Sequence, residues 1–289
     1  MSGSYSEVVL GVVASFLAFV LGLAWRRLTK LVVNYRARRF WRPLVERHLT
    51  VVLGRLPLPQ FEASGVVGAG DNIALRELSD YLHRIGFRHF SLLYHDESGW
   101  NSSSTITPLT GNLILLGGPD ANSLTREVIG RITLGLEFRE VTPAHLRAIQ
   151  QGRAQIDRPP TPPRRWPGQR RRSPGAPQWR VPVMVDRTSR QVYGPTRDGD
   201  DVHSDCGVMI RCPNPFNPDR EVMIFCGSYG YGTWAAVRFA VSDEFLRRLP
   251  AGARFVECVL SADIVHHAPQ RPTVEVLRPL TTGERTGRP

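Results

Sequence analysis

Cysteine is scarce in this chain, and the few that occur do not form a metal-binding pattern. Four cysteines are spread over 289 residues, none in a CxxC pair and none with a histidine at the spacing of zinc ligands. This arrangement argues against a structural zinc site. Because two of them lie in apolar runs, we expect free, buried thiols in a reducing compartment. The four are Cys206, Cys212, Cys226 and Cys258.

Acidic residues are missing where the basic residues cluster. Residues 26–42 hold seven basic side chains and no acid, and residues 153–180 hold eight arginines against the single acid Asp157. Each segment contributes +7 to a formal charge of +11, so about −3 remains for the rest of the chain. The high charge therefore belongs to two short segments and not to a broad basic face, which makes a nucleic-acid partner unlikely.

Charge of either sign is absent from Val8 to Trp25, a run of eighteen residues. A helix of this length covers about 27 Å, close to the thickness of a bilayer core. Glu7 precedes the run and Arg26 and Arg27 follow it at once, which is unlike a cleavable signal peptide. The sequence therefore predicts a single-pass membrane protein, with residues 1–25 forming a short external N-terminus and a transmembrane helix, and with the C-terminal part cytoplasmic.

Residues 26–55 are predicted to form a basic juxtamembrane helix, because apolar residues recur at helical spacing among the basic ones. Phe40 and Trp41 could lie at the level of the lipid headgroups. The alternative is a helix that packs on the soluble domain. Anionic lipid would be contacted by Arg26, Arg27, Lys30, Arg36, Arg38 and Arg39.

The rest of the chain alternates apolar runs with helical patterns, which is typical of an α/β sandwich with a mixed sheet. Its first part spans 56–150 and its second part 181–280, with a tail at 281–289; two subdomains are the alternative. Helices are expected at 73–85, 123–132 and 234–249. Strands are expected at 90–94, 112–116, 207–212, 221–226, 255–260 and 273–277.

Residues 151–180 interrupt this pattern with prolines and arginines and almost no aliphatic side chains. Such a composition cannot bury a core, so we expect a disordered insertion. It could contact lipid headgroups or RNA, or it could be a solvated loop without a partner.

Three glycine-rich turns follow strand candidates and precede helix candidates. In open α/β sheets, ligands bind at such turns, where helix N-termini offer N–H groups to phosphate. None of the turns matches a GxGxxG fingerprint or supplies a Walker A lysine. Together they predict a pocket for a phosphate-bearing ligand, with Tyr229 or Tyr231 available to stack on a base. The candidate ligand-binding residues are Gly70, Asp71, Asn72, Gly117, Gly118, Asp120, Asn122, Gly227, Ser228, Tyr229, Gly230, Tyr231, Gly232 and Thr233.

Asp71 and Asp205 are the candidate catalytic residues. A carboxylate beside a ribose could bind its hydroxyls, and one beside a glycosidic carbon could act as acid, base or nucleophile. The alternatives are a helix N-cap at Asp71 and a strand-entry hydrogen bond at Asp205. No spacing indicates a Ser-His-Asp or Cys-His site, and no metal or cofactor is indicated.

The motifs GGPDAN, NPFNP and GSYGYGT, at residues 117–122, 214–218 and 227–233, carry a resemblance to uncharacterised membrane-anchored bacterial proteins with a Rossmann-like domain. The chain more loosely resembles the nucleotide-sensing and nucleotide-processing Rossmann-like domains of bacterial defence systems. The resemblance covers about residues 65–260 and implies a Rossmann-like fold and a nucleotide-like ligand.

Three functions fit these observations. The leading hypothesis is a membrane-tethered ligand-binding or sensory domain. The second is a hydrolase that cleaves a nucleotide or NAD, and the third is a non-catalytic membrane scaffold.

Overall fold

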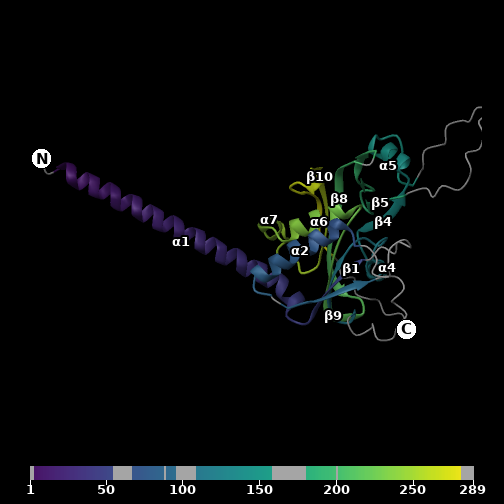
Figure 1. Ribbon diagram of the computed structural model, residues 1–289, viewed down its shortest axis with the longest axis horizontal. Coiled ribbons are helices and arrows are strands. Elements are labelled where there is room, and N and C mark those ends of the chain that lie inside the picture. Colours follow the sequence, from purple (N-terminus) through teal and green to yellow (C-terminus); the bar gives the residue numbers. More distant parts are fainter. Residues whose placement is uncertain are drawn as a thin grey trace, which may run out of the picture. The chain divides into compact units, whose positions relative to one another are not determined.

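The computed structural model describes residues 3–54, 67–87, 89–95, 109–157, 180–199 and 201–280 (Figure 1). The chain divides into two units, Met1–Pro43 and Leu44–Pro289. Most of the predicted insertion, all of the predicted tail and the start of the predicted α/β domain at 56–66 lie outside the described residues.

The N-terminal unit consists of helix α1 (Gly3–Val45), whose last two residues belong to the second unit. Among the described residues, no helix is both long enough and apolar enough to cross a bilayer, so the transmembrane prediction for Val8–Trp25 is not supported. The side chains of residues 8–14 in that span, and those of Arg26, Arg27 and Lys30, lie outside the description. Phe40 and Trp41 are buried and pack edge to face with ring centroids 5.6 Å apart.

A mixed α/β domain follows, which agrees with the predicted fold class. Four neighbouring strands run parallel in the order β2 (Ser91–His95), β1 (Leu49–Gly54), β3 (Asn112–Leu116) and β9 (Asn217–Gly227). Strand β1 corrects the prediction that residues 26–55 are helical throughout. Its six residues are all buried, as expected for a parallel strand that is covered on both faces.

The other half of the main sheet is antiparallel. The hairpin of β8 (Asp201–Asn214) and β9 is joined on the β8 side by β10 (Val256–Val265). Strands β12 (Thr273–Pro279) and β11 (Ala268–Pro269) pair with β10, and β7 (Thr196–Asp198) pairs with β8. The predicted strands at 207–212 and 221–226 are therefore longer than expected, since most of the proline-containing connection continues the ladder and only residues 215 and 216 form the turn.

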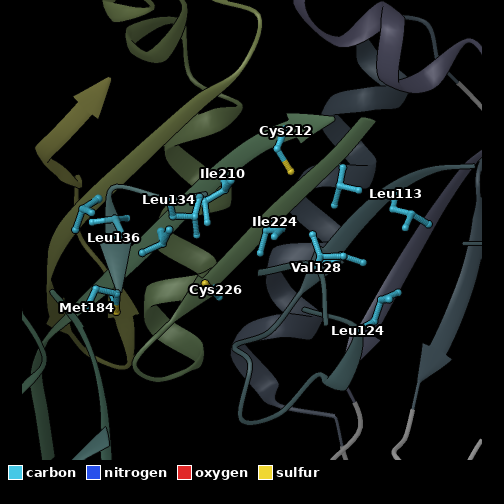
Figure 2. Packing of buried hydrophobic residues seen from close by; sticks show 14 of the residues in the cluster. Leu113, Leu124, Val128, Leu134, Leu136, Met184, Ile210, Cys212, Ile224 and Cys226 are labelled. Carbon is cyan, nitrogen blue, oxygen red and sulfur yellow. The ribbon is translucent and has the colours of Figure 1, made fainter. Parts of the chain in front are cut away.

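Helices cover both faces of this sheet. α4 (Ser123–Arg131) lies on one face, where Leu124 and Val128 pack on Leu113 and Ile224 (Figure 2). α2 (Ala69–Arg84) and α6 (Gly230–Ala240) lie side by side on the other face (Figure 1). All four cysteines are buried free thiols, as predicted, and burial raises the pKa of each.

The helix predicted at 234–249 is in fact two helices, α6 and α7 (Asp243–Arg248). Ser242 causes the break: its hydroxyl accepts the N–H of Phe245 at 3.2 Å and so caps a new helix.

A second, smaller sheet was not predicted. It pairs β4 (Leu136–Val141), β5 (Val181–Asp186) and β6 (Val192–Tyr193) in antiparallel fashion, and α5 (Pro143–Gln150) packs against it. The half-buried ring of Tyr229 packs on the same core. This contact places the small sheet beside the turn that follows β9.

One ion pair is fully buried in the main sheet. The guanidinium of Arg211 on β8 donates from Nε to Oε2 of Glu221 on β9 at 2.8 Å, and both side chains are 2% exposed. Glu221 also receives Nη2 of Arg254 at 2.5 Å. The carboxylate of Glu221 therefore neutralises the buried charge of Arg211.

Candidate functional site

The carboxyl ends of the parallel strands form the edge where the sequence predicted a ligand pocket. Strand β2 lies to one side of the central pair β1 and β3, and β9 lies to the other. The helices that follow the central strands, α2 and α4, lie on opposite faces of the sheet (Figure 1). The chain therefore leaves β1 and β3 towards opposite faces of the sheet. Open α/β sheets bind their ligands at such a point between neighbouring parallel strands.

Glycines bring the three predicted turns together at this edge. A methyl group added to Gly70 would lie 2.2 Å from the carbonyl oxygen of Gly230, and one added to Gly118 would lie 3.6 Å from that of Gly227. A methyl group on Gly117 would lie 3.5 Å from Oδ2 of Asp71. The turns after β3 and β9 and the start of α2 therefore converge on one place.

Gly54 is a fourth member of this edge, and the sequence patterns did not predict it. It ends β1, and an added methyl group would lie 2.5 Å from the carbonyl oxygen of Ala121 in the turn after β3. The signal was a glycine directly after the apolar run LTVVL. It was missed because that run was assigned to the basic helix.

Asn122 holds the turn between β3 and α4. Its Oδ1 accepts the N–H groups of Leu124 at 3.1 Å and Thr125 at 3.3 Å, and its Nδ2 donates to the carbonyl of Leu116 at 3.1 Å. Gly117 has a φ of 105°, a conformation that favours glycine. Asn122 is thus an N-cap, the alternative role for a polar residue in such a turn, and it is fully buried.

Asp71 is the third residue of α2, and its side chain is only 7% exposed. Thr233 interacts with its carboxylate, and Oδ1 of Asp71 is buried without a hydrogen-bond partner among the described residues. Burial raises the pKa of Asp71 to about 6, the negative charge of Asp120 adds to this, and Thr233 opposes it. A buried oxygen left without a donor is costly, and such groups concentrate at functional sites.

Asp205, the other candidate acid, is fully buried beneath the start of α6. Its Oδ1 accepts the N–H of Cys206 at 2.8 Å, and Oδ2 accepts those of Tyr229 at 3.1 Å and Gly232 at 2.5 Å. Burial raises the pKa of this carboxyl well above its usual range, and the three N–H groups oppose that rise. Both carboxylate oxygens of Asp205 therefore accept backbone N–H groups of the turn. This is the structural alternative to a catalytic role.

The two predicted stacking residues differ in their surroundings. The ring of Tyr229 packs on the core of the small sheet, and its hydroxyl accepts Nη1 of Arg197 at 3.5 Å. The ring of Tyr229 is therefore already in contact with other side chains of the protein. Tyr231 is half-buried, and its hydroxyl lies 3.3 Å from Nδ1 of His267.

The remaining predicted residues are divided between the interior and the surface. Ser228, Gly232 and Thr233 are buried, whereas Asn72 and Asp120 are exposed. The pKa of Asp120 is raised because the surrounding turns exclude part of its solvent, although the N–H groups of Asp120 itself and of Ala121 lower it.

Nowhere in the described part of the chain do three histidine, cysteine, aspartate or glutamate side chains gather as a metal site would require. Comparison with protein-family models, with curated proteins and with solved structures finds no match to this chain.

Proposed function

We propose that this Rossmann-like domain binds a small nucleotide-like ligand at the carboxyl edge of β1, β3 and β9. The observation that carries the proposal is Oδ1 of Asp71, which is buried without a partner among the described residues at the point where the glycine-rich turns meet. A ribose hydroxyl would supply the donor that this oxygen lacks, which is the use that dinucleotide-binding domains make of a carboxylate.

The electrostatics of the edge favour a ligand with few negative charges. N–H groups at the start of α2 can bind a phosphate, since Gly68 precedes the helix and has no side chain to cap it. Asp71 and Asp120 lie near the same turns and would repel a triphosphate. Nucleoside monophosphates and dinucleotides such as NAD are therefore better candidates than ATP or GTP.

The pKa of Asp71 supports a second candidate function, hydrolysis of the same class of ligand. A carboxyl with a pKa of about 6 can both donate and accept a proton near neutral pH, as general acid–base catalysis requires. Asp205 is the weaker candidate for this role, because its oxygens accept backbone N–H groups.

A ligand screen tests both functions in the full-length chain. We expect a nucleoside monophosphate or a dinucleotide to raise the melting temperature, with a gain of about 2.7 kcal/mol when the ligand is at 100 times its Kd. Asp71→Asn should remove this shift, because the ribose loses its charged acceptor. Asp80→Asn is the matched control, since Asp80 is an exposed acid on the same helix.

Two outcomes would contradict the binding proposal: no phosphate-bearing ligand stabilises the protein, or the shift survives in Asp71→Asn. Chromatography of the same incubations separates the two functions. Products that form with the wild type and not with Asp71→Asn would favour the hydrolase.

We also propose that α1 tethers this domain to the cytoplasmic side of a membrane. Large apolar side chains on the described part of α1 are exposed, including Phe16 at 65%, Leu21 at 67% and Trp25 at 69%. Exposed apolar side chains of this size are favoured in contact with lipid. The stretch from Val8 to Trp25 also contains no charge.

Liposome flotation tests the tether. The full-length chain should float with vesicles that contain anionic lipid, and a variant that combines Phe16→Asp, Phe19→Asp and Leu21→Asp should remain at the bottom of the gradient. A variant that combines Ile73→Asp and Leu92→Asp, at exposed apolar residues of the α/β domain, is the control and should still float. Equal flotation of the α1 variant would rule out this role.

A further inference from the structure

A cavity lies away from the Asp71 edge, between α5, β5 and the segment that contains β7. Its volume is about 280 Å³, the size of a small organic molecule. Its apolar wall includes Leu146 and Val181, which belong to the core of the small sheet, together with Pro143 and Pro195. Part of the cavity wall is therefore apolar and continuous with the core of the small sheet.

Two guanidinium groups complete the lining. Arg147 lies in the last turn of α5 and Arg197 on β7, and none of the residues that line the cavity is acidic. Arg147 is exposed and has no acidic partner among the described residues. Among the described lining residues, an apolar wall with two arginines and no acidic side chain favours an anion over a cation or a neutral solute.

The arginine on β7 is held in place before any ligand arrives. Nε of Arg197 donates to the carbonyl of Gly199 at 2.8 Å, and Nη1 donates to the hydroxyl of Tyr229 at 3.5 Å. The opposite wall is also fixed, because Nε2 of Gln150 on α5 donates to the carbonyl of Pro195 at 3.1 Å. A site whose parts are already oriented loses little entropy on binding.

The geometry points to a second binding site here, for a small molecule that joins a carboxylate or phosphate group to an apolar body. The oxyanion binds Arg147 and Arg197, and the apolar body lies against Leu146, Val181 and the prolines. This site is separate from the one proposed at Asp71 and takes a different class of ligand, because a ribose is not required.

Titration calorimetry of the full-length chain with benzoate and with phenyl phosphate tests the site. We expect at least one of the two to bind, and inorganic phosphate and benzyl alcohol to bind at least about tenfold more weakly, because each supplies only half of the contacts. Benzoate alone would identify a carboxylate ligand and phenyl phosphate alone a phosphate ligand, and either result supports the site.

Arg147→Gln and Arg197→Gln should each weaken binding about tenfold, the loss of one charge-assisted hydrogen bond of about 1.4 kcal/mol. Arg153→Gln is the control, because Arg153 is an exposed arginine just after α5 that does not line the cavity. Asp71→Asn should leave probe binding unchanged, so failure at one site is distinguishable from failure at the other.

The site is overturned if neither organic anion binds, or if inorganic phosphate binds as well as phenyl phosphate. It is also overturned if both arginine variants bind as the wild type does. The far-ultraviolet circular dichroism and melting temperature of each variant show that it is folded before binding is compared.

Discussion

Glu221→Ala is expected to lower the free energy of unfolding by about 3–5 kcal/mol. The substitution leaves the guanidinium of Arg211, which is 2% exposed, without the carboxylate that neutralises it. A buried charge that loses its counter-ion keeps the cost of its lost hydration without the Coulombic attraction that offset it. Urea unfolding followed by circular dichroism measures the loss.

A matched control is the exposed pair of Glu127 and Arg131 on α4, whose side chains are 41% and 51% exposed. Glu127→Ala should cost less than about 0.5 kcal/mol, because water screens such a pair. Arg211→Met combined with Glu221→Leu should restore most of the stability, since neither charge then remains buried. A loss below about 1 kcal/mol in Glu221→Ala would show that water or other polar groups solvate Arg211 in the variant.

Asp71→Asn is expected to stabilise the protein above pH 6 and to leave its stability nearly unchanged at pH 4. The folded state raises the pKa of Asp71 from 3.8 to about 6, so the folded protein holds this proton more tightly than the unfolded chain does. Stability therefore falls as the pH rises from about 4 to about 6 and stays low above that range. The difference corresponds to roughly 3 kcal/mol at pH 8.

Thermal or urea unfolding of wild type and Asp71→Asn between pH 4 and pH 8 measures this effect. Asp80→Asn, at an exposed acid on the same helix, is the control for the substitution itself. Parallel stability curves for wild type and Asp71→Asn would mean that the Asp71 carboxyl is not perturbed. A variant that is more stable and yet fails to bind a nucleotide-like ligand would show that the protein keeps Asp71 at the expense of stability.

Strong local patterns made part of the fold predictable. The run NLILL, closed by Gly117, gave β3 with its correct bounds, because a short, fully apolar run that ends in glycine is typical of a buried strand. β1 was missed, because LTVVLG follows the basic helix too closely for a change of period to be visible. The small sheet was missed because the alternation of apolar and polar residues in β4, with the sequence LEFREV, holds for only its first four residues.

The edge of the sheet was predictable, but the role of each side chain was not. Turns between parallel strands and helices must meet at one edge, so the convergence of Gly70, Gly117 and Gly230 followed from the order of elements. The difference between Asp71 and Asp205 depends on which donors approach them from other elements. Gly232 and Tyr229 reach Asp205 from 27 and 24 residues away, and no local pattern encodes such contacts.

Strand β9 also sets the order in which the sheet can assemble. It pairs with β8, the strand just before it, and with β3, where Leu113 and Val222 are partners 109 positions apart. A ribosome that adds roughly 5–20 residues per second needs roughly 5–20 s to cover that distance. Throughout this interval the edge of the apolar strand β3 that pairs with β9 has no partner. The nascent chain is therefore expected to depend on a chaperone until β9 emerges.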